Sequence, residues 1–376
     1  MVLVLINPVC GDKSAAAFVD QHVLPHLNTA NISYDFATTT APNSSGPIVA
    51  SHPSRTTVIL ASGDGTLHEL VNHSSLTAQL NVVLIPCGTA NALYGSLFPG
   101  VDTATTEGKL HSLRAFLDNR PTKPLSLART TITDSPKTIN AAVVVSTALH
   151  AAILHDSEEL RNEHPGTERF KIAAQKNSTV WYNASLNLHG PVQIYNPSTK
   201  DFVPFSSDAL SGPFVYFLST VNVDRLEPAF VITPLARRIP PPPQSDGATC
   251  DIVVLRPLRD PLLSTDTEDA RKAYAATTWA ALTGAYQDGA HIDLTYTPTT
   301  NKEAQISEVG PALSDIPVLE YFRCTGWDWT PVSGPEGASA RLVCTDGAID
   351  SIPEGGNVRC CAQGDEATVL RVSIFA

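Results

Sequence analysis

The sequence predicts an α/β domain built on a parallel sheet, followed by a domain of mainly antiparallel β-structure. Before residue 100, three short apolar runs end at glycine-bearing loops, and each is followed by a helix-like pattern. Beyond residue 124 the runs become short, β-branched and separated by proline, glycine and aspartate, which is typical of antiparallel sandwiches or barrels. At 376 residues the chain is also longer than one hydrophobic core usually supports, so two domains are expected.

The first domain is predicted over residues 1–123. Its strand candidates are VLVLINP, TTVILASG and NVVLIPCG, and each precedes a segment with apolar residues at helical spacing. Repeated strand–loop–helix units form parallel sheets covered by helices, and the loops at the carboxyl ends of their strands bind ligands. The three glycine loops are therefore expected to meet at one edge of the sheet.

The second domain is predicted over residues 124–340, with residues 341–376 as a closing segment that returns toward the first domain. Its strand candidates include INAAVVVS, PFVYFLST, CDIVVLRP and HIDLTYTP, and the run VLRVSIF near the C-terminus is grouped with them. One helix is expected over about residues 267–286, where Ala275, Trp279, Leu282 and Tyr286 are spaced to line one face. We interpret this stripe as the face that packs on the core.

Charge and composition exclude several classes of function. The 37 acidic and 25 basic side chains give a net charge of −12, so a nucleic-acid partner is not expected. The longest apolar run, residues 141–154, is too short to span a bilayer. The N-terminus has no signal-peptide pattern, and the seven cysteines contain no C-x-x-C pair, which favours a reducing compartment. A cytoplasmic protein is expected, with peripheral membrane attachment as an alternative.

An aspartate stands between two glycines in SGDGT, residues 62–66, where the second strand candidate ends. Asp64 could be no more than a polar residue in a tight turn. Alternatively, the backbone N–H groups of the turn and the start of the next helix form an anion site on which Asp64 acts. The loops NPVCG at residues 7–11 and PCGTAN at residues 86–91 favour the second interpretation, because all three loops belong to the same edge of the sheet.

Together these loops resemble the diacylglycerol kinase and sphingosine kinase family of lipid kinases, which has N-P-x-x-G, [SG]-G-D-G-T and P-x-G-[TS]-x-N at consecutive strand ends. No G-x-x-x-x-G-K-[ST] P-loop is present. The resemblance implies ATP and Mg²⁺ as cofactors, and it makes Asp64 the proton acceptor or metal ligand at the γ-phosphate. The residues of this domain that it assigns to the nucleotide are Asn7, Gly11, Thr40, Ser62, Gly63, Gly65, Thr66, Gly88, Thr89 and Asn91.

A later segment, HDSEELRNEHPGTERFKIA at residues 155–173, is similar to the D-S-E-x-x-R segment of sphingosine and ceramide kinases. The resemblance places Glu158, Arg161 and Arg169 at positions that meet the nucleotide or its phosphates. The alternative is a charged helix that faces water. We favour the nucleotide role because a triphosphate needs cations opposite it in an otherwise acidic protein.

Near the C-terminus, LVCTDGAI at residues 342–349 resembles the V-D-G-E turn that closes over the phosphates in this family. Asp346 and Gly347 match the turn, and Asp346 is the second predicted Mg²⁺ ligand. Ala348 stands where glutamate is usual, so the resemblance does not supply one expected carboxylate. Asp350 and Glu354 are candidates to replace it.

The acceptor is expected to be a lipid hydroxyl at a membrane surface that the protein contacts transiently. Sphingosine kinases place an aspartate three residues before the serine of the D-S-E segment, where it pairs with the amine of a sphingoid base. Leu154 stands there in this chain, and Asp156 is the nearby carboxylate. Leu154, Asp156 and Glu69 form the predicted acceptor-binding set.

A sphingoid long-chain base is the leading substrate class, with diacylglycerol or ceramide as the alternative. An NAD kinase shares the glycine–aspartate turn and the two-domain plan. A nucleotide-binding protein that has lost catalysis is a third hypothesis, motivated by Ala348. The sequence leaves the oligomeric state open, with a homodimer as one alternative.

Overall fold

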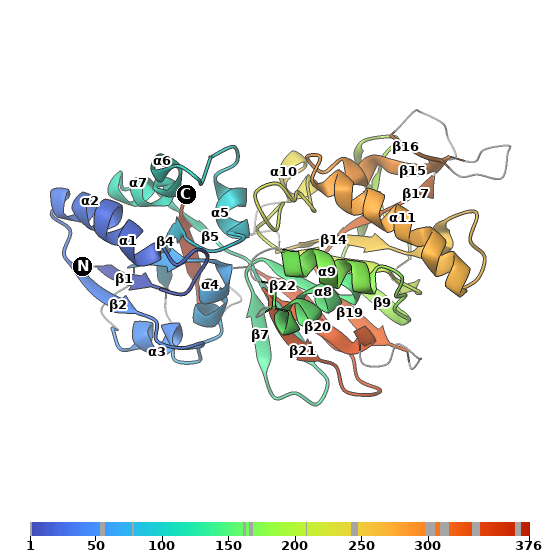
Figure 1. The fold of residues 1–376 in the computed structure, drawn as a ribbon, viewed down its shortest axis with the longest axis horizontal. Helices are drawn as coiled ribbons and strands as arrows, with labels where there is room; N and C mark the ends of the chain where they lie inside the picture. The colour runs from blue at the N-terminus through green and yellow to red at the C-terminus, as the bar shows by residue number, and fades with distance from the viewer. Residues whose placement is uncertain are drawn as a thin grey trace.

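The computed structural model describes residues 2–52, 57–76, 79–160, 163–164, 168–207, 209–241, 247–297, 305–308, 316–332, 339–364 and 370–376. Within these ranges the chain forms an N-terminal α/β domain beside a C-terminal domain of antiparallel sheets (Figure 1). The fold class predicted from the sequence is confirmed.

The N-terminal sheet has the strand order β2-β1-β3-β4-β23-β5, and only β5 runs antiparallel to its neighbour. Its strands are β1 (Val2–Ile6), β2 (Tyr34–Thr38), β3 (Thr57–Ser62), β4 (Leu80–Pro86), β5 (Thr122–Pro124) and β23 (Val372–Phe375). The strands β1, β3 and β4 are almost entirely buried, as expected for parallel strands covered on both faces. Grouping VLRVSIF with the second domain is wrong, because β23 pairs with β4 and β5 in this sheet.

Helical segments cover both faces of this sheet. They are α1 (Ala15–Phe18), the π-helical η1 (Val19–Val23), α2 (Leu24–Thr29), α3 (Ser45–Ala50), α4 (Asp64–Val71), α5 (Ala92–Leu97), α6 (Thr106–Lys109) and α7 (His111–Leu117). Leu67, Leu70 and Val71 of α4 are buried, so this helix is held firmly where it leaves β3. The C-terminal strand is fixed by α7, where the Ser112 hydroxyl donates to the Phe375 carbonyl at 2.6 Å.

The C-terminal domain contains two large antiparallel sheets and a small one. The first, in spatial order, consists of β11 (Asp201–Pro204), β10 (Gln193–Asn196), β18 (Glu320–Cys324), β14 (Cys250–Leu255), β13 (Tyr216–Thr220), β8 (Val144–Thr147), β20 (Leu342–Thr345) and β21 (Ala348–Ser351). The second consists of β12 (Ala209–Ser211), β9 (Ala184–His189), β19 (Gly326–Pro331), β22 (Val358–Gln363), β6 (Leu127–Ile132) and β7 (Thr138–Ala141). The third contains β16 (Gln305–Glu308), β15 (Leu294–Thr297) and β17 (Ile316–Pro317).

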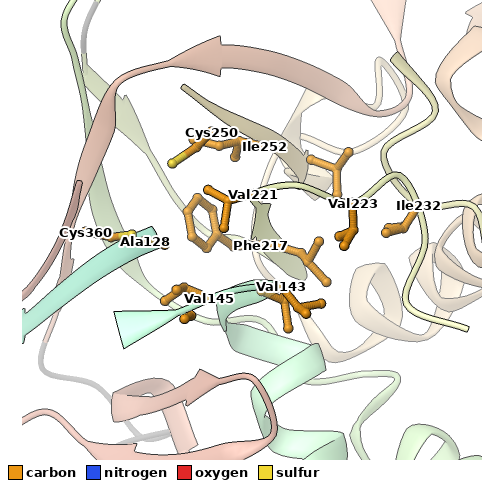
Figure 2. Packing of buried hydrophobic residues seen from close by; sticks show 14 of the residues in the cluster. Ala128, Val143, Val145, Phe217, Val221, Val223, Ile232, Cys250, Ile252 and Cys360 are labelled. Carbon is orange, nitrogen blue, oxygen red and sulfur yellow. The ribbon is translucent and has the colours of Figure 1, made fainter. Parts of the chain in front are cut away.

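Aromatic side chains join the two large sheets. The ring centroid of Phe217 on β13 lies 4.6 Å from that of Trp327 and 5.3 Å from that of Trp329, both on β19. Figure 2 shows Phe217 among buried aliphatic neighbours from β8 and β14, including Val145 and Ile252. This core fixes β8, whose first residues face the N-terminal domain.

The helices of the C-terminal domain are α8 (Ala148–Glu159), α9 (Glu168–Asn177), α10 (Leu235–Arg238) and α11 (Glu268–Ala285), with 3-10 turns at Pro257–Arg259, Ala290–Asp293 and Ser339–Arg341. Among the described residues, no helix combines the length and apolar character needed to cross a bilayer. The run at residues 141–154, predicted as buried core, forms β8 and the first half of α8.

The helix predicted over residues 267–286 is present as α11, but the prediction of its packing face is wrong. Trp279 is 36% exposed and Tyr286 is 54% exposed. The buried face consists of Ala270, Tyr274, Thr277, Thr278, Ala281, Gly284 and Ala285. Close approach decides the orientation, because a Cβ atom on Gly284 would lie 2.7 Å from the His291 backbone nitrogen. The face that carries Gly284 and Tyr274 therefore packs inward, and the rings of Trp279 and Tyr286 remain outside.

Candidate active site

The loops that follow β1, β3 and β4 meet at one edge of the N-terminal sheet. The Asn7 side-chain amide donates to the Thr66 hydroxyl at 3.1 Å, which joins the first loop to the second. The Ser62 and Thr66 hydroxyls are 2.5 Å apart, and the Cys87 N–H donates to the Ser62 carbonyl at 3.0 Å. These bonds bring together predicted nucleotide residues that are about 80 positions apart in the sequence.

Three of the loop glycines are required by close packing. A Cβ atom on Gly88 would lie 2.4 Å from the Gly63 Cα atom, so the second and third loops touch backbone to backbone. Gly11 has a φ of +50°, and a Cβ there would lie 2.2 Å from the Cys87 carbonyl oxygen. Gly65 differs, because a Cβ at this position would meet nothing within 4 Å. The space beside Gly65 is open to a ligand.

Asp64 is the first residue of α4, and its carboxylate faces the start of α5. Its oxygens accept hydrogen bonds from the Ala92 N–H at 2.7 Å and the Leu93 N–H at 3.2 Å. Asn91 prepares this arrangement, because its left-handed backbone (φ +52°) and its side-chain bonds to the N–H and C=O groups of Gly88 fix the turn before α5. Asp64 therefore links the start of α4 to the start of α5, and its role toward a ligand stays a prediction.

The environment of Asp64 raises the pKa of its carboxyl group. Burial raises the pKa of Asp64 to about 6, although the hydrogen bonds from the Ala92 and Leu93 N–H groups act in the opposite direction. The negative charge of Asp346 adds to the increase in pKa. A carboxylate with a pKa of about 6 is ionised at neutral pH and accepts a proton more readily than an ordinary aspartate.

We expect kcat/KM for a neutral acceptor to fall below about pH 6, because protonated Asp64 cannot accept the hydroxyl proton. The raised pKa of Asp64 gives folding stability the opposite dependence on pH. Because this pKa in the folded protein lies above the ordinary value of 3.8, the free energy of unfolding decreases as the pH rises through about 6. The rate should be measured against pH with an acceptor that has no amine. A flat rate profile across this range would contradict the role of Asp64 as a base.

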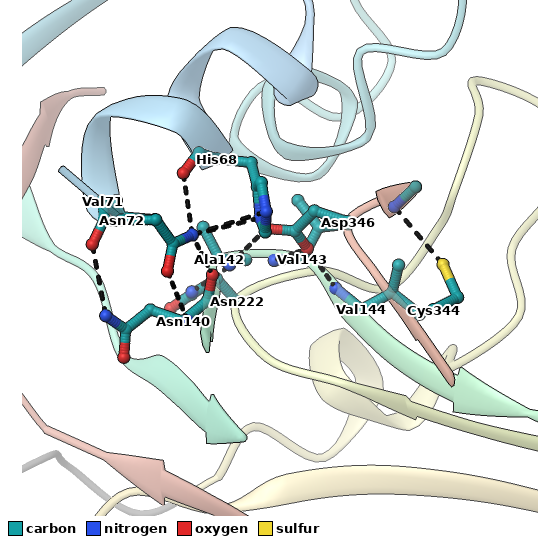
Figure 3. Close-up of polar contacts among 11 residues, drawn as sticks. His68, Val71, Asn72, Asn140, Ala142, Val143, Val144, Asn222, Cys344 and Asp346 are labelled. Atoms are coloured by element: carbon teal, nitrogen blue, oxygen red, sulfur yellow. Dashed lines mark hydrogen bonds and ion pairs between the residues drawn. The ribbon is translucent and has the colours of Figure 1, made fainter. Parts of the chain in front are cut away.

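Asp346 joins the C-terminal turn to both domains (Figure 3). Its carboxylate accepts N–H bonds from Ala142 at 2.7 Å, Val143 at 2.9 Å and Val144 at 2.8 Å, just before and at the start of β8. The His68 ring on α4 lies 3.3 Å from the same carboxylate. With its side chain only 1% exposed, Asp346 is a bridge between α4 and β8.

Asp346 also shapes the hairpin between β20 and β21. Asp346 and Gly347 have φ values of +49° and +96°, which identifies the two-residue aspartate–glycine turn that suits the twist of a hairpin. Ala348 follows as the first residue of β21 and is exposed. Asp350 lies two residues further along the same strand, on the same side of the sheet.

We expect Ala348→Glu to increase activity or Mg²⁺ affinity if the site lacks a carboxylate at this exposed position. If Asp350 already supplies it, Asp350→Asn should be damaging and the Ala348 substitution neutral. The measurement is kcat as a function of Mg²⁺ concentration for both variants and for Glu354→Gln. Unchanged metal dependence in all three would show that the turn has been aligned incorrectly.

Both helices that contact the Asp64 carboxylate are also fastened to the C-terminal domain. At the C-terminal end of α4, the side chain of the capping residue Asn72 donates to the Asn140 carbonyl at 2.8 Å and accepts from the Asn140 N–H at 2.7 Å (Figure 3). On α5, the Ser96 hydroxyl donates to the Asp224 carboxylate at 2.9 Å. The orientation of the two domains is therefore linked to the position of Asp64.

The carboxylates fit Mg²⁺ only together with nucleotide phosphates. Among the described residues, no group of three histidine, cysteine, aspartate or glutamate side chains is placed to hold a metal ion. Proteins usually bind nucleotide-associated Mg²⁺ through one or two carboxylates, and the phosphates supply further oxygens. A cation beside Asp64 would also relieve its repulsion by Asp346. Asp64 is the better ligand of the two, since the Asp346 oxygens already accept three N–H groups.

The predicted nucleotide residues on α8 and α9 pair with each other. The Arg169 guanidinium lies 3.5 Å from the Glu158 carboxylate and stacks 4.7 Å above the centroid of the Phe170 ring. Its Nε is buried and has no hydrogen-bond partner among the described residues. Arg161 lies outside the described residues. Contact of these residues with a nucleotide stays a prediction.

The predicted acceptor residues are placed differently from one another. Asp156 on α8 lies 2.9 Å from the Lys176 ammonium, and it accepts from the Asn177 amide at 2.8 Å. Burial opposes ionisation, but these hydrogen bonds and the one from His155 hold the pKa of Asp156 below its ordinary value. Leu154 is half-buried on the same helix. Asp156 is therefore ionised and already has a cation beside it.

Of the three remaining predicted residues, Glu69 and Thr40 lie near α3, and Thr89 lies elsewhere on the N-terminal domain. Glu69 accepts from the Asn43 N–H at 2.8 Å and from the Ser45 hydroxyl at 2.6 Å, so it ties α4 to the start of α3. Thr40 is exposed just beyond β2, and Thr89 is exposed in the loop after β4. The binding roles of Glu69, Thr40 and Thr89 stay predictions.

The sequence analysis missed the residues that connect the domains. His68 and Asn72 follow Asp64 by four and eight positions and therefore lie on nearly the same side of α4. This spacing of polar residues on a helix that starts at a catalytic candidate was the available signal. Their partners Asn140 and Asp346 are far away in the sequence and carried no comparable signal.

Comparison with known proteins agrees with this geometry. Residues 1–120 match the model of the diacylglycerol kinase catalytic domain. Sphingosine kinase 1 from Rattus norvegicus is 28% identical over 245 residues, which is 62% of this chain and 62% of the rat protein. Residues 1–120 thus carry a diacylglycerol kinase catalytic domain, and the chain is similar to sphingosine kinases.

Two further proteins show similarity over shorter or more divergent alignments. Sphingosine kinase 1 from Homo sapiens is 32% identical over 136 residues, covering 34% of this chain and 35% of the human protein. The alignments thus span less than two thirds of the length of these sphingosine kinases. A putative diacylglycerol kinase from Bacillus anthracis has a TM-score of 0.55 at 15% identity and covers 99% of this chain and 94% of its own. The likeness to the bacterial structure concerns the fold alone.

Proposed function

We propose that this chain is an ATP-dependent lipid kinase that transfers the γ-phosphate to a lipid hydroxyl. The observation that carries the proposal is the position of Asp64, which has a pKa of about 6 and lies where the three strand-end loops converge. Phosphoryl transfer needs mainly positioning and charge neutralisation, together with a group that accepts the hydroxyl proton. Bound Mg²⁺, held by Asp64 and the phosphates, would neutralise the negative charge that develops on the phosphate oxygens.

The residues around Asp64 have distinct tasks in this reaction. The open space beside Gly65 lets the phosphates approach the backbone at the start of α4, an eight-residue helix whose N-terminus favours anions. Asn91 and the α5 N–H groups hold the Asp64 carboxylate in one orientation. Asp64 then accepts the proton of the lipid hydroxyl as the hydroxyl oxygen attacks the γ-phosphorus, and the bond between the γ-phosphorus and the bridging oxygen breaks to release ADP.

A sphingoid long-chain base is the proposed acceptor, with Asp156 as the partner of its amine. The curated relatives that align with this chain are sphingosine kinases, which favours this class. Asn177 holds the Asp156 carboxylate, while the neighbouring Lys176 side chain is 63% exposed. An exposed lysine is readily displaced, so the acceptor ammonium can take its place beside Asp156. If no ammonium enters, a neutral acceptor such as diacylglycerol or ceramide is the better substrate.

We expect Lys176→Met to increase kcat/KM for sphinganine severalfold, because it removes the cation that competes for Asp156. The kcat/KM for diacylglycerol of similar chain length should not change. Addition of Asp156→Asn to the Lys176→Met variant should reverse the gain for sphinganine. The measurement is a matched competition between the two lipids on the wild-type protein, the Lys176→Met variant and the double variant. Equal effects on both lipids would assign the acceptor to the neutral class.

The proposed activity is tested with purified protein and labelled ATP against sphinganine, ceramide, diacylglycerol and NAD. Phosphorylation of a lipid and not of NAD supports the lipid kinase. Phosphorylation of NAD alone would support the NAD kinase alternative. ATP binding without transfer to any acceptor would support a protein that has lost catalysis.

A further inference from the structure

The outer face of α11 carries an exposed stripe without charge, formed by Ala273, Ala276, Trp279, Thr283 and Tyr286 and called here the α11 stripe. Trp279 is 36% exposed and Tyr286 is 54% exposed. No charged residue occurs between Lys272 and Asp288, although the chain has a net charge of −12. Surface helices of soluble domains normally carry charged or polar residues on this face. The stripe therefore needs an explanation beyond packing.

One end of the α11 stripe leads toward the candidate active site. The Tyr286 ring packs 4.8 Å from that of Phe230, and its hydroxyl donates to the Glu227 carboxylate at 2.6 Å. The adjacent Pro228 lines a pocket of about 230 Å³ together with Asn91. Asn91 also lines the small cavity that contains Asp64. The pocket thus shares Asn91 with the cavity of Asp64, and on its other side it is lined by Pro228, the residue after the Glu227 partner of Tyr286.

We propose that the α11 stripe lies on a lipid bilayer and holds the open pocket against the membrane that supplies the acceptor. The proposal rests on the proposed lipid kinase function and names the surface that function requires. Figure 1 shows α11 along the outside of the C-terminal domain, with its C-terminal end toward the N-terminal domain. A lipid that leaves the bilayer at Tyr286 would meet the pocket before it reaches Asp64.

The size of the α11 stripe favours a membrane over a second protein. Residues 273–286, the last of which caps α11, extend roughly 20 Å, and a helix face is about 10 Å wide, so the stripe offers about 200 Å². Stable protein–protein interfaces bury about 800 Å² on each partner. Tryptophan and tyrosine instead suit the boundary between water and lipid, where their rings enter the apolar region and their polar atoms stay hydrated.

Charge further specifies the membrane. The stripe is neutral in an acidic protein, so attraction to anionic headgroups contributes nothing. Binding should therefore occur on zwitterionic phosphatidylcholine vesicles and should change little with salt. Stronger binding to phosphatidylserine that is lost in salt would contradict this mode of attachment.

The tryptophans of this chain provide a direct probe. Trp181, Trp327 and Trp329 are fully buried, whereas Trp279 is 36% exposed. Phosphatidylcholine vesicles that contain brominated acyl chains should quench the Trp279 component of the fluorescence of the full chain, and vesicles should protect it from acrylamide. Absence of both effects while the protein sediments with vesicles would overturn the proposal, because another surface would then make the contact.

Ala276→Glu tests the same surface and retains the Trp279 probe. A charge in the centre of the stripe should weaken sedimentation with sucrose-loaded phosphatidylcholine vesicles by about tenfold. Val332→Glu is the matched control, because Val332 is 55% exposed outside α11 and its substitution should leave binding unchanged. Wild-type binding by the Ala276 variant, or no binding by the wild-type protein, would overturn the proposal. A lipid-free dimer that this variant dissociates would identify a second copy as the occupant instead.

A short-chain acceptor below its micelle concentration separates this proposal from the proposed function. The Ala276 variant should phosphorylate that soluble acceptor at the wild-type rate and lose rate only on vesicle-borne lipid. If no acceptor is phosphorylated but vesicle binding still depends on Ala276, the proposed function fails and the membrane surface stands. If the soluble acceptor is phosphorylated and vesicle binding ignores Ala276, the membrane surface fails and the kinase stands.

Discussion

Asp64→Asn is expected to lower kcat by roughly 10²-fold or more at saturating ATP, while the protein stays folded. The substituted amide cannot accept the hydroxyl proton, and it binds a cation less well than a carboxylate. Its oxygen can still accept one of the two N–H bonds from α5, so the turn keeps part of its support. The expected signature is therefore a loss of turnover that far exceeds the change in thermal stability.

Asp12→Asn is the matched control for this substitution. Asp12 also follows a loop glycine, but its carboxylate is exposed and, among the described residues, its partners lie within its own loop, where it accepts hydrogen bonds from the N–H and hydroxyl of Ser14. It should retain wild-type turnover. Turnover of the Asp64 variant above about a tenth of the wild-type value would remove Asp64 from the role of base.

The N-terminal sheet was predictable because its signals are local. Each of its first buried strands is a continuous apolar run that ends in a glycine loop, and the geometry of parallel sheets places such loops together. The sequence could not show that Asp64 reaches the α5 N–H groups, because that contact depends on the left-handed turn at Asn91. A residue type and its spacing identify a candidate, and tertiary contacts determine its pKa.

Other features depended on partners that are distant in the sequence. The residue pattern of α11 did not indicate which face is buried, since the close approach of Gly284 to the His291 backbone outweighs the hydrophobicity of Trp279. The cation beside Asp156 comes from a separate helix and carries no signal in the D-S-E segment. The backbone donors of Asp346 likewise come from residues about 200 positions earlier.

Gly88→Ala is expected to reduce both stability and turnover. Its Cβ atom would lie 2.4 Å from the Gly63 Cα atom, where neither backbone segment can yield without moving a strand end. Overpacking of this kind costs about 1–3 kcal/mol of unfolding free energy. The loop that shifts leads directly to Asn91 and to the α5 N–H groups that orient Asp64. A displacement of about 1 Å in an active site costs roughly 10²-fold in rate, so kcat should fall by a similar factor.

Glycines occur in these loops either because two backbones pack closely, as at Gly88, or because a ligand needs the space, as expected at Gly65. Gly65→Ala separates these two reasons. Apart from its chain neighbours and the backbone of its own helix, no described atom lies within 4 Å of a Cβ at this position, and alanine favours the helix that begins here, so thermal stability should be unchanged or slightly higher. If the open space beside Gly65 admits phosphate, the added methyl group should raise the KM for ATP without lowering the melting temperature. The two variants are compared by thermal unfolding and by the KM for ATP. An unchanged KM in the Gly65 variant would place the phosphates elsewhere, and wild-type stability in the Gly88 variant would contradict the backbone contact between the loops.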